Sequence, residues 1–182
     1  MSMNVENTTL VLVDMQEKLI NGGMYRKDKM LKKQELMLKS AKELGLSIIV
    51  TEQYTDGLGY TIDKFQELIE NCPIVEKTTF SCCGEPVFNK TLAKKRNENI
   101  ILIGIEAHIC IQQTALDLLE KGYSVYVLTD AVTSRAKNDK EVATTYMQSK
   151  GINIITVEAV IFELLKDSKH LSFKAISTFV KQ

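Results

Sequence analysis

Hydrophobic residues along this 182-residue chain follow two alternating patterns. Short, nearly unbroken runs of Val, Ile and Leu are typical of strands that are buried on both faces. Between them, apolar residues recur three and four positions apart, which is the spacing of one face of a helix. The expected strands are Thr9–Val13, Ser47–Val50, Pro73–Glu76, Ile100–Ile103, Ser124–Leu128 and Ile152–Thr156. The expected helices are Met30–Leu44, Thr61–Glu70, Val87–Lys95, Ile111–Glu120, Asp139–Lys150 and two within Val157–Val180, broken near Asp167–Ser168.

This alternation of strands and helices predicts the α/β fold class. We expect a three-layer α/β/α arrangement, with a Rossmann-like six-stranded parallel sheet and helices on both faces. The chain has only two prolines and shows no internal repeat or low-complexity segment. Residues 1–182 are therefore expected to form one domain. In such folds, ligands bind beyond the carboxyl ends of the strands, near a switch in strand order.

Composition narrows the classes of partner. Lys and Arg together number 23, as do Asp and Glu, so no overall field favours nucleic acid or an anionic membrane. No apolar run reaches membrane-spanning length, and the first residues lack the pattern of a signal peptide. We expect a cytoplasmic protein that acts on a small molecule and binds neither nucleic acid nor membrane.

The four cysteines do not predict a disulfide framework or a metal centre. Cys82 and Cys83 are adjacent, no Cys-x-x-Cys pair occurs, and the only histidines are His108 and His170. A zinc site with the usual spacing is therefore not expected, and no cofactor is implied. A redox role for Cys82 and Cys83 is one interpretation, and the pattern favours two partly buried bystanders.

Three chemically active residues follow or end expected strands: Asp14, Lys77 and Cys110. Cys110 falls where a helix begins, so unpaired N–H groups and the helix dipole are expected to favour its thiolate. Asp14 can accept the thiol proton and return it to a leaving group, while Lys77 stabilises both anions. Each residue also has an ordinary structural interpretation: a packed thiol, a helix cap and a solvated surface charge.

The turn from Gly104 to Ile109 adds backbone N–H groups near the thiol. Such groups at a helix start can stabilise negative charge on a carbonyl oxygen. His108 is an alternative proton acceptor, but its position inside the turn favours a structural role or a place at the pocket edge.

These residues lie in motifs that resemble the isochorismatase-like cysteine hydrolase superfamily. Within it, the sequence is most similar to the isochorismatase domain-containing protein branch. The segments that resemble the superfamily are Leu10–Gln16, Glu76–Ser81 and Gly104–Ala115, and those that resemble the branch are Thr51–Gly59 and Thr129–Arg135. The resemblance implies a catalytic triad of Asp14, Lys77 and Cys110, and self-association into a homo-oligomer.

The resemblance also implies finer features of the site. A cis peptide bond is expected between Ile105 and Glu106, and an oxyanion hole at the backbone N–H groups of Glu106 and Cys110. The implied substrate pocket includes four side chains: Leu19, Gln53, Tyr54 and Phe80.

Two departures from related families shape the expected activity. Nicotinamidase-type members carry an Asp-x-His metal motif where this chain has Glu52–Tyr54, so no bound metal is expected and nicotinamide is a weaker substrate candidate. Isochorismatases proper often lack the cysteine, so Cys110 favours acyl transfer. We expect a hydrolase that cleaves the C–N bond of a small amide-type molecule through a thioester. The alternatives are vinyl-ether hydrolysis with Asp14 as the acid, and a non-catalytic small-molecule-binding or assembly module.

Overall fold

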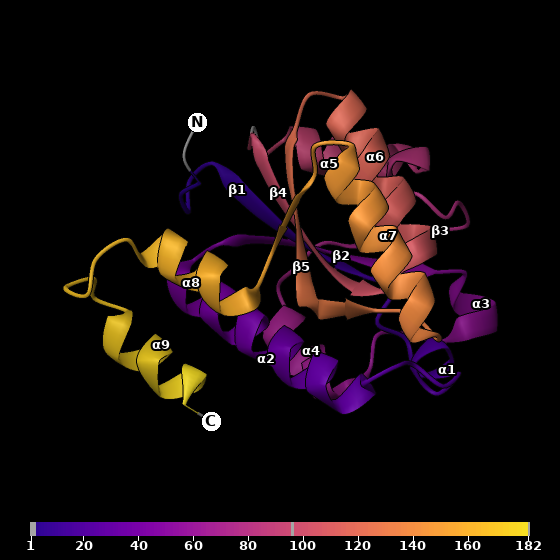
Figure 1. Ribbon diagram of the computed structural model, residues 1–182. Helices are drawn as coiled ribbons and strands as arrows, with labels where there is room; N and C mark the ends of the chain where they lie inside the picture. Colours follow the sequence, from indigo (N-terminus) through magenta and orange to yellow (C-terminus); the bar gives the residue numbers. More distant parts are fainter. Residues whose placement is uncertain (1–2, 96, 182) are drawn as a thin grey trace.

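The computed structural model describes residues 3–95 and 97–181 and contains one six-stranded sheet (Figure 1). All strand pairs are parallel, in the order β3-β2-β1-β4-β5-β6. The strands are β1 Thr8–Val13, β2 Ser47–Gln53, β3 Ile74–Lys77, β4 Asn99–Ile105, β5 Ser124–Thr133 and β6 Asn153–Ile155. The predicted fold class is confirmed.

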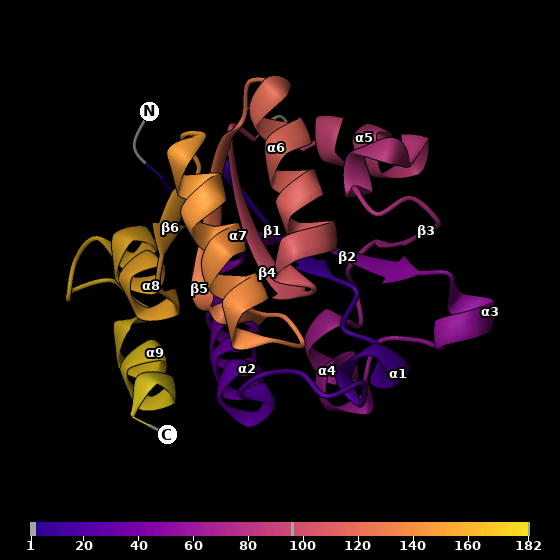
Figure 2. The same ribbon diagram turned by 45° about the vertical axis from the view of Figure 1, so that its right-hand side comes forward.

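Helices cover both faces of this sheet (Figures 1 and 2). One layer contains α2, α4, α8 and α9, and the other contains α5, α6 and α7. The described helices are α1 Glu17–Ile20, α2 Lys27–Leu44, α3 Thr55–Leu58, α4 Asp63–Ile69, α5 Pro86–Ala93, α6 Gln112–Glu120, α7 Lys137–Ser149, α8 Val157–Leu165 and α9 Phe173–Val180. The short helices α1 and α3 were not predicted, because four residues are too few to show a helical period.

The sheet lies between two hydrophobic cores. Along β1, Leu10 and Leu12 pack into the core beneath α2, whereas Val11 and Val13 pack into the core beneath α6. Successive side chains of a strand point to opposite faces, so a strand covered on both sides needs apolar residues at every position. This explains the unbroken apolar runs of the sequence.

The strand order creates a switch point between β1 and β4. The chain leaves β1 to add β2 and β3 on one side, and then crosses back to add β4, β5 and β6 on the other. The connections that leave β1 and β4 therefore diverge at the carboxyl edge, where α/β proteins form their ligand crevice. Asp14 directly follows β1 at this point.

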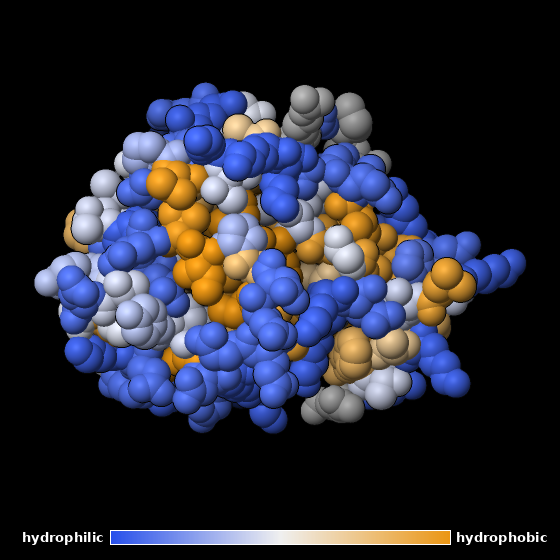
Figure 3. Space-filling view, turned by 180° about the vertical axis from the view of Figure 1, so that it is seen from behind, coloured by the Kyte–Doolittle hydropathy of each residue, from blue (hydrophilic) through white to orange (hydrophobic). Residues whose placement is uncertain are grey.

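The face seen from behind carries hydrophobic residues in its middle, surrounded by hydrophilic ones (Figure 3). The exposed large apolar side chains of the described residues include Tyr60 and Leu171. Across the described ranges, no helix combines the length and apolarity needed to cross a membrane. Self-association, which the resemblance implies, stays a prediction.

Candidate active site

Asp14 and Lys77 form a buried ion pair at the carboxyl edge of the sheet. The Lys77 Nζ lies 2.8 Å from Asp14 Oδ2, and both side chains are almost fully buried. Lys77 ends β3, whereas Asp14 follows β1, and β2 lies between these two strands. The lysine stem therefore spans one strand to reach the carboxylate. Burial of two charges is tolerated here because they are paired and hydrogen-bonded.

Strand β2 supplies the groups that orient this pair. The Thr51 hydroxyl donates to Asp14 Oδ1 at 2.8 Å, and Gln53 Oε1 accepts from Lys77 Nζ at 2.5 Å. Each carboxylate oxygen of Asp14 thus has its own donor, which fixes the carboxylate plane. Sequence reasoning did not identify Thr51, although a hydroxyl at the end of the apolar run Ile48–Val50 was a usable signal.

Lys77 has further acceptors that keep it charged. Its Nζ lies 3.2 Å from the carbonyl oxygens of Thr79 and Phe80. Burial by itself lowers the pKa of Lys77, but the Asp14 carboxylate and two cysteine sulfurs outweigh it, so the pKa is raised. The ammonium form therefore persists at neutral pH.

Cys110 lies in a one-turn π-helical segment, Ala107–Ile111, between β4 and α6. The chain enters this segment through Gly104, at φ 146°, and Glu106, at φ 56° and ψ 59°. A left-handed glutamate is uncommon and marks a constrained turn. At Gly104, an added Cβ would lie 2.3 Å from the carbonyl oxygen of Val13, so only glycine fits beside β1.

The expected cis bond between Ile105 and Glu106 was wrong, because the described residues contain no cis peptide. The strain in this turn is instead at Glu106, whose backbone is left-handed. Ile109 and Ile111, on either side of Cys110, both donate their N–H groups to the Glu106 carbonyl oxygen, at 2.9 and 3.4 Å. The oxyanion hole at the Glu106 and Cys110 amides stays a prediction.

The Cys110 thiol shares its surroundings with Asp14 and Lys77. Burial raises the pKa of Cys110, and so do the charge of Asp14 and a hydrogen bond to that carboxylate, whereas Lys77 acts in the opposite direction. The net shift is upward, so the thiol stays protonated in the resting protein. Lys77 therefore favours the thiolate, as expected, but burial and the neighbouring carboxylate outweigh it. The contribution of the helix start stays a prediction.

Cys82 is a second buried thiol beside the same carboxylate. Burial and then Asp14 raise its pKa to about 11, and its sulfur lies 3.8 Å from the Thr51 hydroxyl. Its backbone N–H donates to Thr114 of α6 at 2.9 Å. Burial likewise raises the pKa of Cys83 to about 12. Both cysteines are free thiols and protonated at neutral pH, which agrees with the bystander interpretation.

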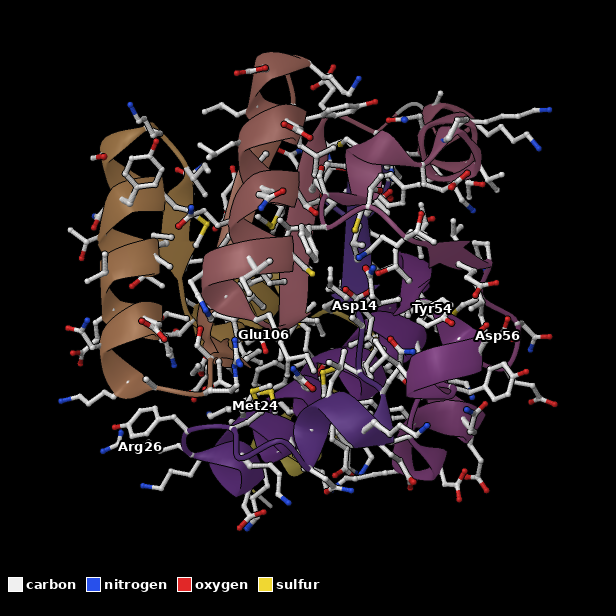
Figure 4. The ribbon with its side chains drawn as sticks, turned by 90° about the vertical axis from the view of Figure 1, so that its right-hand side faces the viewer. Asp14, Met24, Arg26, Tyr54, Asp56 and Glu106 are labelled. Atoms are coloured by element: carbon white, nitrogen blue, oxygen red, sulfur yellow. The ribbon has the colours of Figure 1, made fainter. Side chains whose placement is uncertain are left out.

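The four residues expected to line a pocket occupy different environments. Gln53 contacts Lys77 directly, and the Phe80 ring is exposed although its carbonyl accepts from the same ammonium. The Tyr54 side chain is exposed, and its backbone is left-handed, at φ 37°. It lies to one side of Asp14 (Figure 4). Leu19 is half-buried against the core beneath α2. Their contact with substrate stays a prediction.

His108 takes part in a separate polar network. Its Nδ1 lies 2.9 Å from the Ser134 hydroxyl and 3.6 Å from Glu106 Oε2. Arg135 Nε lies 3.3 Å from the other oxygen of Glu106. Within the described ranges, no hydrogen bond joins His108 to Asp14 or Cys110. This placement agrees with a structural role for His108 in holding the turn.

The residues in place of the family's metal motif do not fit a metal centre. The Glu52 carboxylate accepts from the Thr61 N–H and hydroxyl at 2.7 Å each, and Gln53 holds Lys77. In the part of the chain that the structure describes, no group of three or more His, Cys, Asp or Glu side chains is placed to hold a metal ion.

Comparisons with known proteins show the family to which this chain belongs. The isochorismatase domain model matches residues 8–159. Isochorismatase family protein 1B of Dictyostelium discoideum is 38% identical over 97% of this chain and 87% of its own length. Isochorismatase domain-containing protein 2 of Xenopus laevis is 35% identical over 97% of this chain and 84% of its own length. The structure of MAR1 ribonuclease from Caenorhabditis elegans superposes with a TM-score of 0.94, at 38% identity, over 100% of this chain and 93% of that one.

Proposed function

Because the chain belongs to the isochorismatase family of hydrolases, we propose that it is a cysteine hydrolase that cleaves the C–N bond of a small amide-type molecule. The observation that carries this proposal is the meeting of an acid, an ammonium and a thiol at the switch point of the sheet. Asp14 forms an ion pair with Lys77 at 2.8 Å, and the same carboxylate acts on the Cys110 thiol and raises its pKa. A carboxylate in contact with a protonated thiol is placed to remove its proton.

The first half of the reaction forms a thioester. As the Cys110 sulfur attacks the carbonyl carbon, its proton passes to Asp14, so no free thiolate is needed beforehand. Lys77 stays positive and limits the cost of charge moving within the buried site. Backbone amides of Glu106 and Cys110 stabilise the negative oxygen. The C–N bond then breaks, and Asp14 returns the proton to the leaving nitrogen.

The second half releases the acid. Asp14 removes a proton from water as the water oxygen attacks the thioester carbon. The C–S bond breaks, and the proton returns from Asp14 to the Cys110 sulfur. One water is consumed, and the carboxylate and thiol are restored to their starting forms.

The test is a screen of small amides, ureas and carbamoyl compounds, read out by ammonia release and intact mass. We expect turnover, together with a covalent acyl adduct on Cys110. Cys110→Ala should abolish both, whereas Cys82→Ala removes the neighbouring buried thiol and serves as the matched control. Full activity of Cys110→Ala would exclude the thioester route.

Two rival activities belong in the same screen. Vinyl-ether hydrolysis, with Asp14 as the acid, would survive in Cys110→Ala and be lost in Asp14→Asn. The similar protein from Caenorhabditis elegans is named a ribonuclease, so RNA cleavage is the other rival activity and the screen includes an RNA oligonucleotide. A non-catalytic binding or assembly module would show no turnover and no adduct with any compound class.

A further inference from the structure

A cavity of about 440 Å³ lies against the second half of β5, away from the candidate active site. Asp14, Lys77 and Cys110 do not line it. The lining residues come from the two residues before α2, the first half of α2, the second half of β5 and one position of α7: Tyr25, Arg26, Lys29, Met30, Lys32, Lys33, Thr129, Asp130, Thr133 and Lys140. The volume is that of a site for a small organic ligand.

The lining is strongly cationic. Five of its side chains are Lys or Arg and one is a carboxylate, although the whole chain has a formal net charge of zero. Lys33 lies 3.9 Å from Asp130 Oδ2. Among the described residues, no side-chain hydrogen bond or ion pair neutralises Lys29, Lys32 or Lys140. The cavity lining therefore carries more positive than negative side-chain charge.

Electrostatics inside the cavity reflect this excess. Burial lowers the pKa of Lys140, and the nearby Arg26 charge adds to the lowering, while Asp130 and Glu141 oppose it. An anion bound between Arg26 and Lys140 would attract both side chains and so offset their mutual repulsion. The amino end of α2, which is 18 residues long, adds its positive dipole to the same side of the cavity.

The backbone around the cavity is held in place. Arg26 adopts a left-handed conformation, at φ 51°. The preceding residue, Tyr25, donates its N–H to the Ser134 carbonyl at 2.9 Å and accepts from the Thr133 hydroxyl at 2.6 Å. Figure 4 shows Arg26 on the same side of the molecule as Asp14 and Glu106, but further out. The backbone that carries Tyr25 and Arg26 at the start of α2 is thus held against the end of β5.

We propose that this cavity binds a small organic phosphate. The lysine and arginine groups at the rim would hold the phosphate, since ammonium and guanidinium groups are the usual phosphate ligands. The Tyr25 ring and Met30 would pack against the organic part, and Asp130 would accept from a hydroxyl or amine of the ligand. The single carboxylate and the limited volume favour a small molecule over a polynucleotide backbone.

Isothermal titration with inorganic phosphate and with ribose 5-phosphate, at constant ionic strength, tests this proposal on the full chain. We expect saturable binding of ribose 5-phosphate, stronger than that of inorganic phosphate. The double variant Lys29→Gln, Lys140→Gln should bind about tenfold more weakly or worse, because it removes two charge-assisted contacts. The matched control, Lys169→Gln with Lys174→Gln, removes two lysines outside the cavity and should bind like the unchanged protein.

Several outcomes would overturn the proposal. Absence of saturable binding of both probes would exclude a phosphate site. Equal weakening in the cavity variant and the control would mean that only overall charge matters. Displacement of ribose 5-phosphate by an RNA oligonucleotide, with tighter binding through Lys29 and Lys140, would assign the cavity to nucleic acid instead. Binding is the readout throughout, so the result does not depend on the chemistry of Cys110.

Discussion

Lys77 reaches across β2 to place its Nζ 2.8 Å from Asp14 Oδ2, although the two residues are 63 positions apart in the chain. Both groups are nearly inaccessible to water. In such an environment each charge depends on the other, because neither can recover its hydration. The fold therefore depends on both members of the pair being present, apart from any role that they have in the proposed chemistry.

Loss of Lys77 should be strongly destabilising. Lys77→Met leaves the Asp14 carboxylate buried without its cation, and we expect the free energy of unfolding to fall by about 3–5 kcal/mol. Urea unfolding measures this loss. The control is Lys39→Met, which breaks a partly exposed helical ion pair with Glu35, at 2.6 Å, and should cost at most about 1 kcal/mol. An equal loss of unfolding free energy in the two variants would show that the fold does not depend on the buried pair more than on the exposed one.

Removing the Asp14 charge should make Cys110 more reactive toward alkylation while abolishing turnover. Asp14 raises the pKa of Cys110 through its charge and a hydrogen bond, and Lys77 lowers it. In Asp14→Asn, iodoacetamide labelling of Cys110 at pH 8 should accelerate by about tenfold for each unit by which the pKa falls. Peptide mass spectrometry after timed labelling measures the rate.

Removal of the Lys77 ammonium should change the labelling rate of Cys110 in the opposite direction. In Lys77→Met, labelling of Cys110 should slow down, because the residue that lowers the pKa of the thiol is lost. Circular dichroism should first establish that both variants are folded. An unchanged labelling rate in Asp14→Asn would mean that Asp14 does not control this thiol, and slower labelling would mean that it acts on the thiol as a base rather than by raising its pKa.

Gly104 should not tolerate a side chain. In Gly104→Ala, the new Cβ would meet the Val13 carbonyl oxygen at 2.3 Å, in a backbone conformation at φ 146° that is already unfavourable for alanine. We expect a loss of about 3 kcal/mol or more in thermal or urea unfolding. Gly122→Ala is the matched control: its φ is 88° but nothing lies within 4 Å, so only backbone strain of about 1–2 kcal/mol is expected.

Cys82 should make stability depend on alkaline pH. Its pKa is raised from 9.0 to about 11 by burial in the folded state, so the folded protein retains the thiol proton longer than the unfolded chain does. The resulting stabilisation is complete below pH 9 and is lost as pH rises toward 11. Between pH 8 and 10.5 the protein should therefore lose about 2 kcal/mol more than Cys82→Ala loses over the same range. Urea unfolding at both pH values measures this, and identical pH slopes for the two proteins would refute it.

The sequence by itself determined the alternating strands and helices, and which strand ends are followed by chemically active residues. Local periods of apolar residues depend only on neighbouring positions, so strands such as β1 and helices such as α2 were predicted within a few residues. The placement of Asp14, Lys77 and Cys110 at carboxyl strand ends follows from those same elements. Parallel strands direct these ends to one edge, which is why the sequence alone is enough to group the three residues.

Only the tertiary structure decided how those residues interact. The order of the strands places β2 between Asp14 and Lys77, and thereby brings in Thr51, a contact that no local pattern specifies. The raised pKa of Cys110 depends on burial and on a carboxylate distant in sequence. The cationic cavity likewise joins Arg26 to Lys140 across the fold. Dielectric environment and long-range packing are properties of the assembled molecule, and local sequence patterns do not contain them.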